Sequence, residues 1–224
     1  MLSTTPRTTL NRAKDKARTS REDLYAVLDA GLVCHLGVVS RGFPMVVPTG
    51  YGRIDDTLYL HGSTGATSLR DADEVCVTVT HLDGIVLARS SFNHSVNYRC
   101  AMVYGRARRV EDPEEHLAAL RAITEQLAPG QWEAARKPTR KELAATMVLA
   151  LSLEEASVKV RQGPPVDEDE DYELPIWAGV LPLHQSWGAP EPDPALTADL
   201  AVPEHIASRT MPAPPEMPAA NLPL

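Results

Sequence analysis

A loop rich in glycine and hydroxyl residues follows a predicted strand in residues 59–70. His61 is followed there by Gly62 and Ser63, and Thr67 and Ser68 come shortly after. Backbone N–H groups in such a loop, and at a helix beginning near its end, can hold an anion. The loop lacks the lysine of a P-loop, so an ATP or GTP site is not expected. The segment predicts a small anion site, with a hydroxyl-capped polar turn as the alternative.

A second polar cluster joins two predicted strands in residues 86–99. It concentrates polar and charged side chains between apolar runs, and Arg89, Ser90 and Arg99 are its candidates for ligand contact. Polar clusters on loops often line a binding site, because the loops are held by a rigid scaffold. The alternative is that these side chains only satisfy the backbone of the loop.

A proline interrupts the apolar strand predicted at residues 43–51. Val46 and Val47 precede Pro48, and Thr49 follows it. Proline cannot donate to a sheet ladder, so this strand must lie at an edge or where the ladder is broken. Main-chain groups beside Pro48 are then free to meet a planar ligand. The alternative is an edge strand that is protected against aggregation.

Metal binding is not expected from this sequence. His61 and His94 have no histidine partner at HxxxH or HxH spacing. Residues 167–173 hold six acids in seven residues, which is typical of a solvated loop rather than of a metal site. No Ser-His-Asp order or helical pair of carboxylates stands out, so no catalytic residue is assigned.

The three polar segments must be positioned by a mainly β structure. The Asp83-Gly84 pair predicts a hairpin turn between two strands. Short connections between many strands favour an α+β, mainly β fold, in which an antiparallel barrel carries peripheral helices. Alternating and apolar runs predict strands at 32–39, 43–51, 57–60, 75–80, 85–90, 99–110, 147–153 and 157–161.

Capping signals predict where the helices begin. Ser20 is placed to cap a helix over residues 21–30, and Asp112 precedes a proline and two glutamates in the expected order. Thr139 opens a capping box with the glutamate three residues later. A shorter helix is expected to begin near Thr67.

The composition describes an acidic globular protein. The chain has 224 residues, of which 43% are hydrophobic, so it can bury one sizeable core. A net charge of −8 argues against nucleic acid or an anionic membrane as a partner. Cys34, Cys76 and Cys100 form no CxxC pair and lie in apolar stretches, which predicts reduced thiols in the cytoplasm. No stretch suits a secretory signal or a membrane span.

Three regions are expected along the chain. Residues 1–19 form a basic arm, residues 20–187 form the barrel domain, and residues 188–224 form a tail. The tail holds nine prolines in 37 residues, so we expect it to form no helix or central strand. Its scattered apolar side chains predict partial docking over residues 196–206.

Taken in order, these segments resemble the pyridoxamine 5′-phosphate oxidase-like superfamily, in the branch related to nitroimidazole-resistance proteins. The resemblance covers approximately residues 10–183. Each motif is unspecific alone, and the specificity lies in the ordered set. The matching stretches are residues 20–29, 34–39, 44–49, 59–63, 97–99 and 103–107.

The resemblance implies a split-barrel homodimer that binds one flavin mononucleotide (FMN) in each of two clefts between the subunits. The residues that would run past the isoalloxazine ring are Val46, Val47, Pro48 and Thr49. Those that would hold the ribityl phosphate are His61, Gly62, Ser63, Thr67 and Ser68. The site would be completed, partly from the other subunit, by Arg89, Ser90 and Arg99.

Two departures from the family pattern bear on function. Relatives often carry an Arg-Lys pair in the phosphate loop, whereas this chain has only Arg70 nearby. The Arg-rich, Trp-containing motif of the vitamin B6 oxidases is also missing, so oxidation of pyridoxamine phosphate is not expected.

A flavin-dependent oxidoreductase that acts on an unidentified small molecule is therefore the predicted function. The alternatives are a non-catalytic flavin- or haem-binding module, with His35, His61 or His94 as the axial ligand of a haem, and a dimer without a cofactor that binds a protein partner.

Overall fold

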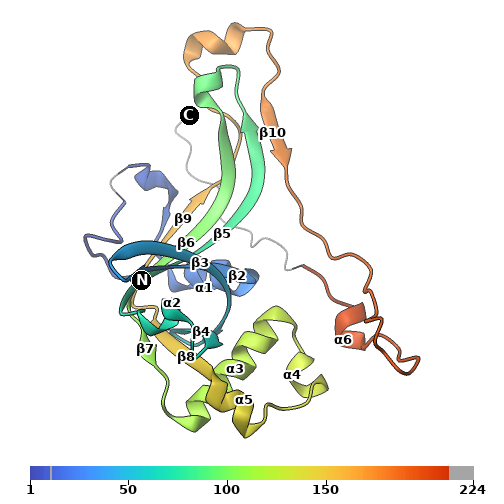
Figure 1. The fold of residues 1–224 in the computed structure, drawn as a ribbon. Coiled ribbons are helices and arrows are strands. Elements are labelled where there is room, and N and C mark those ends of the chain that lie inside the picture. Colours follow the sequence, from blue (N-terminus) through green and yellow to red (C-terminus); the bar gives the residue numbers. More distant parts are fainter. Residues whose placement is uncertain (11, 212–224) are drawn as a thin grey trace.

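A single antiparallel sheet of ten strands dominates the fold (Figure 1). The computed structural model describes residues 1–10 and 12–211. The strands follow the order β1-β9-β6-β5-β2-β3-β4-β8-β7, and β10 pairs with β5. The strands are β1 (Ala17–Arg18), β2 (Val33–Ser40), β3 (Phe43–Ile54), β4 (Thr57–Ser63), β5 (Glu74–Leu87), β6 (Ser95–Arg106), β7 (Arg108–Arg109), β8 (Thr146–Ser152), β9 (Glu155–Arg161) and β10 (Gly179–Pro182). Every strand pair is antiparallel, which confirms the mainly β prediction.

The helices lie around this sheet. Ser20, Asp112 and Thr139 each accept a hydrogen bond from the N–H group three residues on, so all three predicted caps are confirmed. The helices are α1 (Arg21–Ala30), α2 (Thr67–Arg70), α3 (Pro113–Leu127), α4 (Gln131–Ala134), α5 (Arg140–Ala145) and α6 (Glu204–Ala207), with 3₁₀ turns η1 (Lys14–Lys16), η2 (Ser91–Asn93) and η3 (Asp169–Glu173). In the described part of the chain, no helix is long and apolar enough to cross a membrane.

Strand alternation creates two cores, one on each side of β4. Leu58 and Leu60 face the inside of the barrel, which α1 closes with Leu24 and Leu28. Tyr59 lies between them in sequence and faces outward, where it packs in a second cluster with helix α3. The β4 strand therefore links the barrel interior to the helical layer.

Helix α3 approaches strand β3 very closely at Gly52. A Cβ atom at this position would lie 2.5 Å from the backbone nitrogen of Ile123 and 2.6 Å from the carbonyl carbon of Ala122. Only glycine leaves room for the helix backbone at this distance. The outer core therefore depends on the absence of a side chain at one strand position.

The predicted hairpin turn at Asp83-Gly84 is wrong. Strand β5 runs through both residues, and its register with β6 shifts between Leu82 and Gly84. Gly84 marks a β-bulge beside which β10 pairs with β5, and a Cβ there would lie 2.9 Å from the carbonyl oxygen of Leu181. The chain turns later, at η2, so β5 and β6 form a long hairpin that projects from the barrel (Figure 1).

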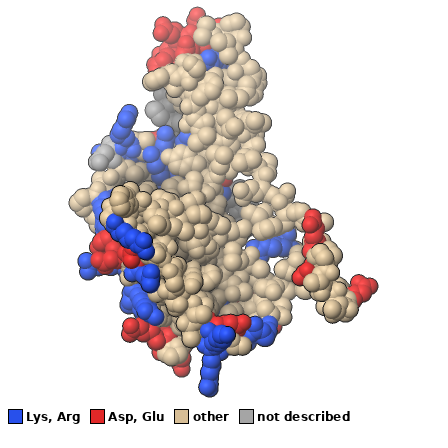
Figure 2. All heavy atoms as spheres, viewed as in Figure 1, with Lys and Arg blue, Asp and Glu red and all other residues tan. Residues whose placement is uncertain are grey.

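The acidic run 167–173 is not wholly a solvated loop. Acidic residues gather at the tip of the projecting hairpin around η3 (Figure 2). The side chain of Asp167, however, is fully buried and accepts hydrogen bonds from the N–H groups of Arg89 and Ser90 at 3.0 and 3.3 Å. Burial raises the pKa of Asp167, but these N–H groups outweigh it and hold the pKa below its usual range. Asp167 therefore attaches the segment between β9 and β10 to the β5–β6 hairpin.

The N-terminal arm lies against the barrel. Strand β1 pairs with β9, and the N–H group of Leu2 donates to the carbonyl of Thr19. Arg7 forms ion pairs with Glu74 and Glu155, which belong to β5 and β9. The arm is therefore part of the described fold.

The tail differs from the expectation in two ways. It contains the one-turn helix α6, which begins directly after Pro203, where the missing N–H group of proline costs nothing. Leu196 and Leu200 remain 47% and 64% exposed, so the partial docking predicted over residues 196–206 is found only at the end of that range. Contact is made instead by His205, whose Nε2 donates to Oε1 of Gln131 at 2.9 Å. The remaining part of the predicted tail, residues 212–224, lies outside the described residues.

Candidate functional site

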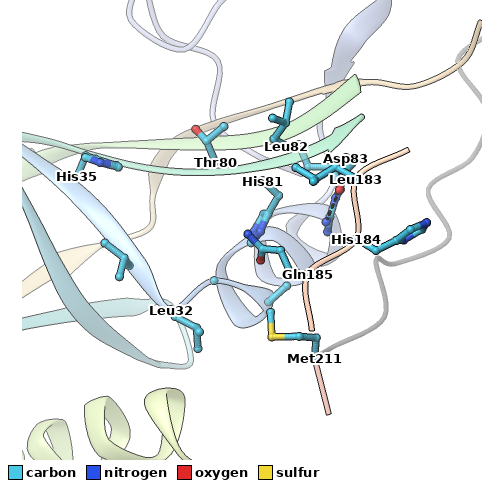
Figure 3. A pocket seen from close by; sticks show the side chains of 14 residues that line it. Leu32, His35, Thr80, His81, Leu82, Asp83, Leu183, His184, Gln185 and Met211 are labelled. Atoms are coloured by element: carbon cyan, nitrogen blue, oxygen red, sulfur yellow. Dashed lines mark hydrogen bonds and ion pairs between the residues drawn. The ribbon is translucent and has the colours of Figure 1, made fainter. Parts of the chain in front are cut away.

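A cavity of about 470 Å³ lies where the end of α1, strands β2 and β5, and the C-terminal segment meet (Figure 3). Such a volume is typical of small-molecule sites. Three imidazoles line it, from His35, His81 and His184, together with the buried guanidinium of Arg99. The cavity thus combines donor nitrogens with apolar walls from Leu32, Leu82 and Leu183.

His81 is held in one orientation by the backbone. Its Nε2 lies 2.9 Å from the carbonyl oxygen of Val27. A carbonyl oxygen can only accept, so Nε2 carries the proton and Nδ1 keeps a free lone pair. Burial lowers the pKa of His81 below 6.5, and the ring is neutral at pH 7. A neutral imidazole anchored to a carbonyl has the properties of a metal ligand.

Arg99 adds a positive charge to the same cavity. Its Nε and Nη2 donate to the carboxylate of Asp83 at 2.9 and 2.8 Å. The residue is only 7% exposed, and its Nη1 is buried without a hydrogen-bond partner among the described residues. Buried donors in folded proteins are rarely left unpaired, so Nη1 is suited to an anionic group of a ligand.

Asp83→Asn is expected to lower the free energy of unfolding by about 1–2 kcal/mol, because Arg99 then lacks a countercharge. The effect stays below that of a fully buried pair, since the Asp83 side chain is 30% exposed. Urea denaturation measures the change. The matched control is Asp73→Asn, whose ion pair with Arg106 is 69% and 72% exposed and should contribute almost nothing. Equal losses in the two variants would contradict the assignment.

The segment around Pro48 lies at an open edge, as expected. Strand β3 pairs with β4 only over Tyr51–Ile54, so the half that carries the four predicted flavin residues has β2 as its one neighbour. Pro48 stands opposite His35 in that ladder. Val46 is 66% exposed. These residues form an accessible apolar edge, and Pro48 pairs with a residue that lines the first cavity.

The predicted phosphate loop is divided between two faces of β4. Thr67 and Ser68 begin α2, and Gly62 faces that helix so closely that a Cβ would lie 2.6 Å from Cδ1 of Leu69. His61 shares the opposite face with Tyr59. Burial lowers the pKa of His61, and its Nδ1 is buried without a partner in the described chain. The structure therefore separates His61 from the hydroxyl groups of α2.

A smaller cavity of about 250 Å³ adjoins α2. Arg70 and Arg109 line it, and neither has an ion-pair partner within residues 1–10 and 12–211. Two guanidinium groups without ion-pair partners in the described chain, beside the end of α2, are suited to a phosphate. The sequence pointed to Arg70, but Arg109 is brought here by the pairing of β7 with β8.

Arg89 and Ser90 lie far from these cavities within one chain. Both bind Asp167 at the tip of the hairpin, and the guanidinium of Arg89 stacks 4.9 Å above the ring of Tyr172. Arg99 pairs with His81, eight residues before Arg89, so the two arginines are roughly 26 Å apart along the strands. Within a single chain, Arg89 and Ser90 therefore lie together at the hairpin tip, and Arg99 lies apart from both.

Sequence reasoning missed His81, Asp83 and His184 as cavity residues. The usable signal was the glycine after Asp83, which marks a bulge as well as it marks a turn. Among the described residues, no three His, Cys, Asp or Glu side chains group closely enough to hold a metal ion by themselves.

Comparisons with known proteins place this geometry in context. The family model described as pyridoxamine 5′-phosphate oxidase matches residues 20–160. The structure of the flavocytochrome Anf3 from Azotobacter vinelandii is similar at 41% identity, with a TM-score of 0.86, over 90% of this chain and 95% of that one. The FAD and heme binding protein from Mycobacterium smegmatis is similar at 40% identity, with a TM-score of 0.83, over 88% and 98%.

A more distant likeness concerns the fold alone. A 5-nitroimidazole antibiotic resistance protein from Bacteroides thetaiotaomicron is 22% identical, with a TM-score of 0.55, over 64% of this chain and 86% of that one. None of the curated proteins compared with the chain matches it. The family and fold expected from the sequence are confirmed: the chain belongs to the pyridoxamine 5′-phosphate oxidase family and has its antiparallel split-barrel fold.

Proposed function

We propose that the protein is a redox protein that binds a flavin and a haem. The observation that carries the proposal is the cavity in which neutral His81 keeps a free Nδ1 beside the unpartnered Nη1 of Arg99. The proposal is supported by the two similar structures at about 40% identity, which are a flavocytochrome and an FAD and heme binding protein.

The residues of this cavity fit a haem. His81 would bind the haem iron through its free ring nitrogen, and His184 is a second imidazole among the lining residues (Figure 3). Arg99 would hold a carboxylate of the macrocycle through Nη1, and leucines from three segments supply apolar walls. A haem bound there would supply one-electron transfer, while the chain provides the ligand, the countercharge and exclusion of water.

The flavin site is proposed at the open half of β3 and the start of α2. Val46, Val47, Pro48 and Thr49 offer the accessible apolar edge for the ring. Arg70 and Arg109 beside α2 supply the charge for phosphate that the loop itself lacks. The sequence favours FMN, whereas the similar protein from Mycobacterium smegmatis is an FAD and heme binding protein, and we propose FAD for this chain.

A second copy of the chain is the proposed partner. Val39, Phe43 and Val46 on the β2–β3 hairpin are 62%, 73% and 66% exposed, which is unusual for large apolar side chains at one edge. A two-fold dimer would cover this edge and place the flavin between subunits. Light scattering should give about twice the 24.4 kDa chain mass. A monomer that still binds flavin would contradict the shared cleft.

The absorption spectrum of the purified protein tests the proposed function. Cells should be supplied with a haem precursor and riboflavin, so that cofactor supply does not limit occupancy. We expect a Soret band that shifts on reduction by dithionite, together with flavin absorbance. Extraction and chromatography of the released flavin distinguish FAD from FMN. A colourless protein that takes up neither added haem nor added flavin would contradict the proposal.

Haem binding is expected to persist to mildly acidic pH. Only the neutral imidazole can bind iron, and burial holds the pKa of His81 below 6.5. Protonation therefore competes with the metal only below that value, and occupancy should be constant from pH 8 to about 6.5 and fall at lower pH. A pH titration of the Soret band measures this. Loss of haem already near pH 7 would exclude His81 as the ligand.

A further inference from the structure

A second cavity of about 480 Å³ lies beside the first, between the C-terminal segment, α1 and α3. The two cavities share Leu32 and Met211 as lining residues. No candidate residue from the sequence lies here, apart from the tail itself. The second cavity is large enough for a nucleotide.

Residues 205–211 of the tail form one wall of the second cavity, and His205 holds them against the chain after α3. His205 donates from Nε2 to Oε1 of Gln131. Its side chain also lies over Gly130, where a Cβ would be 3.1 Å from the Cβ of His205. Gly130 has a φ of 87°, which favours glycine and leaves this space open. The tail therefore packs where the chain after α3 has no side chain.

Among the charged residues that line the second cavity, Arg209 has no ion-pair partner in the described chain. Asp29 is paired with Arg53, whose Nε donates at 2.7 Å. Glu125 accepts from the N–H groups of Gly130 and Trp132 at 2.7 and 2.9 Å. Arg209 has no carboxylate partner in the described chain, and its Nη1 is buried without a hydrogen bond.

An aromatic surface lies beside this arginine. The guanidinium of Arg209 is 4.8 Å from the ring centroid of Trp187, and that residue remains 45% exposed. The stacked arrangement holds the guanidinium plane in a fixed direction. The planar base of a nucleotide can stack on the exposed part of the indole while the phosphates of the same nucleotide reach Arg209.

We propose that the second cavity binds a nucleoside diphosphate group, with Arg209 as the phosphate ligand and Trp187 as the stacking surface for the base. Guanidinium groups bind phosphate through paired hydrogen bonds, and a buried, unpartnered Nη1 is placed for such a bond. The shared wall at Leu32 and Met211 places the bound nucleotide next to the His81 cavity. The proposal does not depend on whether that cavity holds a haem.

ADP is the probe that tests this site on the full-length protein. We expect ADP to quench tryptophan fluorescence and to release heat on binding, and uncharged adenosine to bind at least about tenfold more weakly. Arg209→Gln should weaken ADP binding by about tenfold or more, and Arg209→Lys should recover part of the affinity. Trp187→Phe should remove the quenching while some calorimetric binding remains.

The matched control is Arg140→Gln, on the exposed surface of α5, which should leave ADP affinity unchanged. The diphosphate group could belong to FAD or to a nicotinamide dinucleotide. Measuring ADP binding to the flavin-loaded and the flavin-free protein distinguishes the two. If the adenosine diphosphate of a bound FAD occupies the cavity, ADP binds only after the flavin is removed, and the diphosphate of FAD then lies beside Arg209 rather than beside Arg70 and Arg109. If a nicotinamide dinucleotide is the ligand, ADP binds the flavin-loaded protein and NADH or NADPH displaces it.

The proposal is overturned if neither form of the protein binds ADP, or if ADP binds equally well to the wild type, Arg209→Gln and Trp187→Phe. ADP binding to a protein that takes up neither haem nor flavin would support the nucleotide site and contradict the proposed function. The two proposals therefore fail separately.

Discussion

His81→Ala is expected to lower haem affinity by at least about tenfold and to alter the Soret band of whatever haem remains. The carbonyl of Val27 fixes this ring, and burial keeps it neutral, so its loss removes an oriented nitrogen that a neighbouring side chain cannot replace. Disturbing even the partners of a metal ligand typically costs 10–100-fold in affinity. Haem titration followed by absorbance measures the change.

Two observations separate ligand loss from misfolding in this variant. Added imidazole should enter the space left by the side chain and restore the band, which a disordered cavity could not do. The control is His94→Ala, at the exposed tip of the hairpin, where Nδ1 contacts only the carbonyl of Ser90. An unchanged spectrum for His81→Ala would show that another residue binds the haem iron.

Gly52→Ala is expected to destabilise the fold by about 3 kcal/mol, at the upper end of the usual range for overpacking. The added methyl group would lie 2.5–2.8 Å from backbone atoms of Ala122 and Ile123, and backbone cannot move aside as a side-chain end can. Helix α3 would have to shift away from β3, which opens the outer core around Tyr59. Urea denaturation measures the loss of stability.

Gly50→Ala is the matched control for this prediction. It lies two residues earlier in the same strand, and a Cβ there would meet only the side chain of Leu127, at 3.6 Å. We expect a change within about 0.5 kcal/mol for this variant. A similarly small change for Gly52→Ala would show that the helix is not packed on the strand as described.

Features fixed by local sequence were predictable. Ser20, Asp112 and Thr139 cap helices through bonds to residues three positions away, and such bonds need no distant partner. The strands were found because their side chains alternate between two environments. The edge position of Pro48 also followed, because a residue without an N–H group excludes a full ladder.

Features that depend on contacts between distant parts of the chain could not be predicted from the sequence. Asp-Gly suits both a turn and a bulge, and at Asp83-Gly84 the bulge lies between β6 and β10, which comes almost a hundred residues later. Asp167 looked like one more solvated acid because its partners at positions 89 and 90 are equally remote. His81 carries no motif, and the carbonyl that orients it belongs to another element.

The same long-range construction has a consequence for how the protein matures in the cell. Strand β9 ends at Arg161, whereas both large cavities take part of their walls from residues 183–211. Domains can fold during synthesis from the N-terminus onward, so the barrel is complete before those walls leave the ribosome. The ligands proposed for these cavities can therefore be held only once residues 183–211 have been synthesised. The proposed haem would then be received by strands that have already paired, rather than serving as the centre around which they fold.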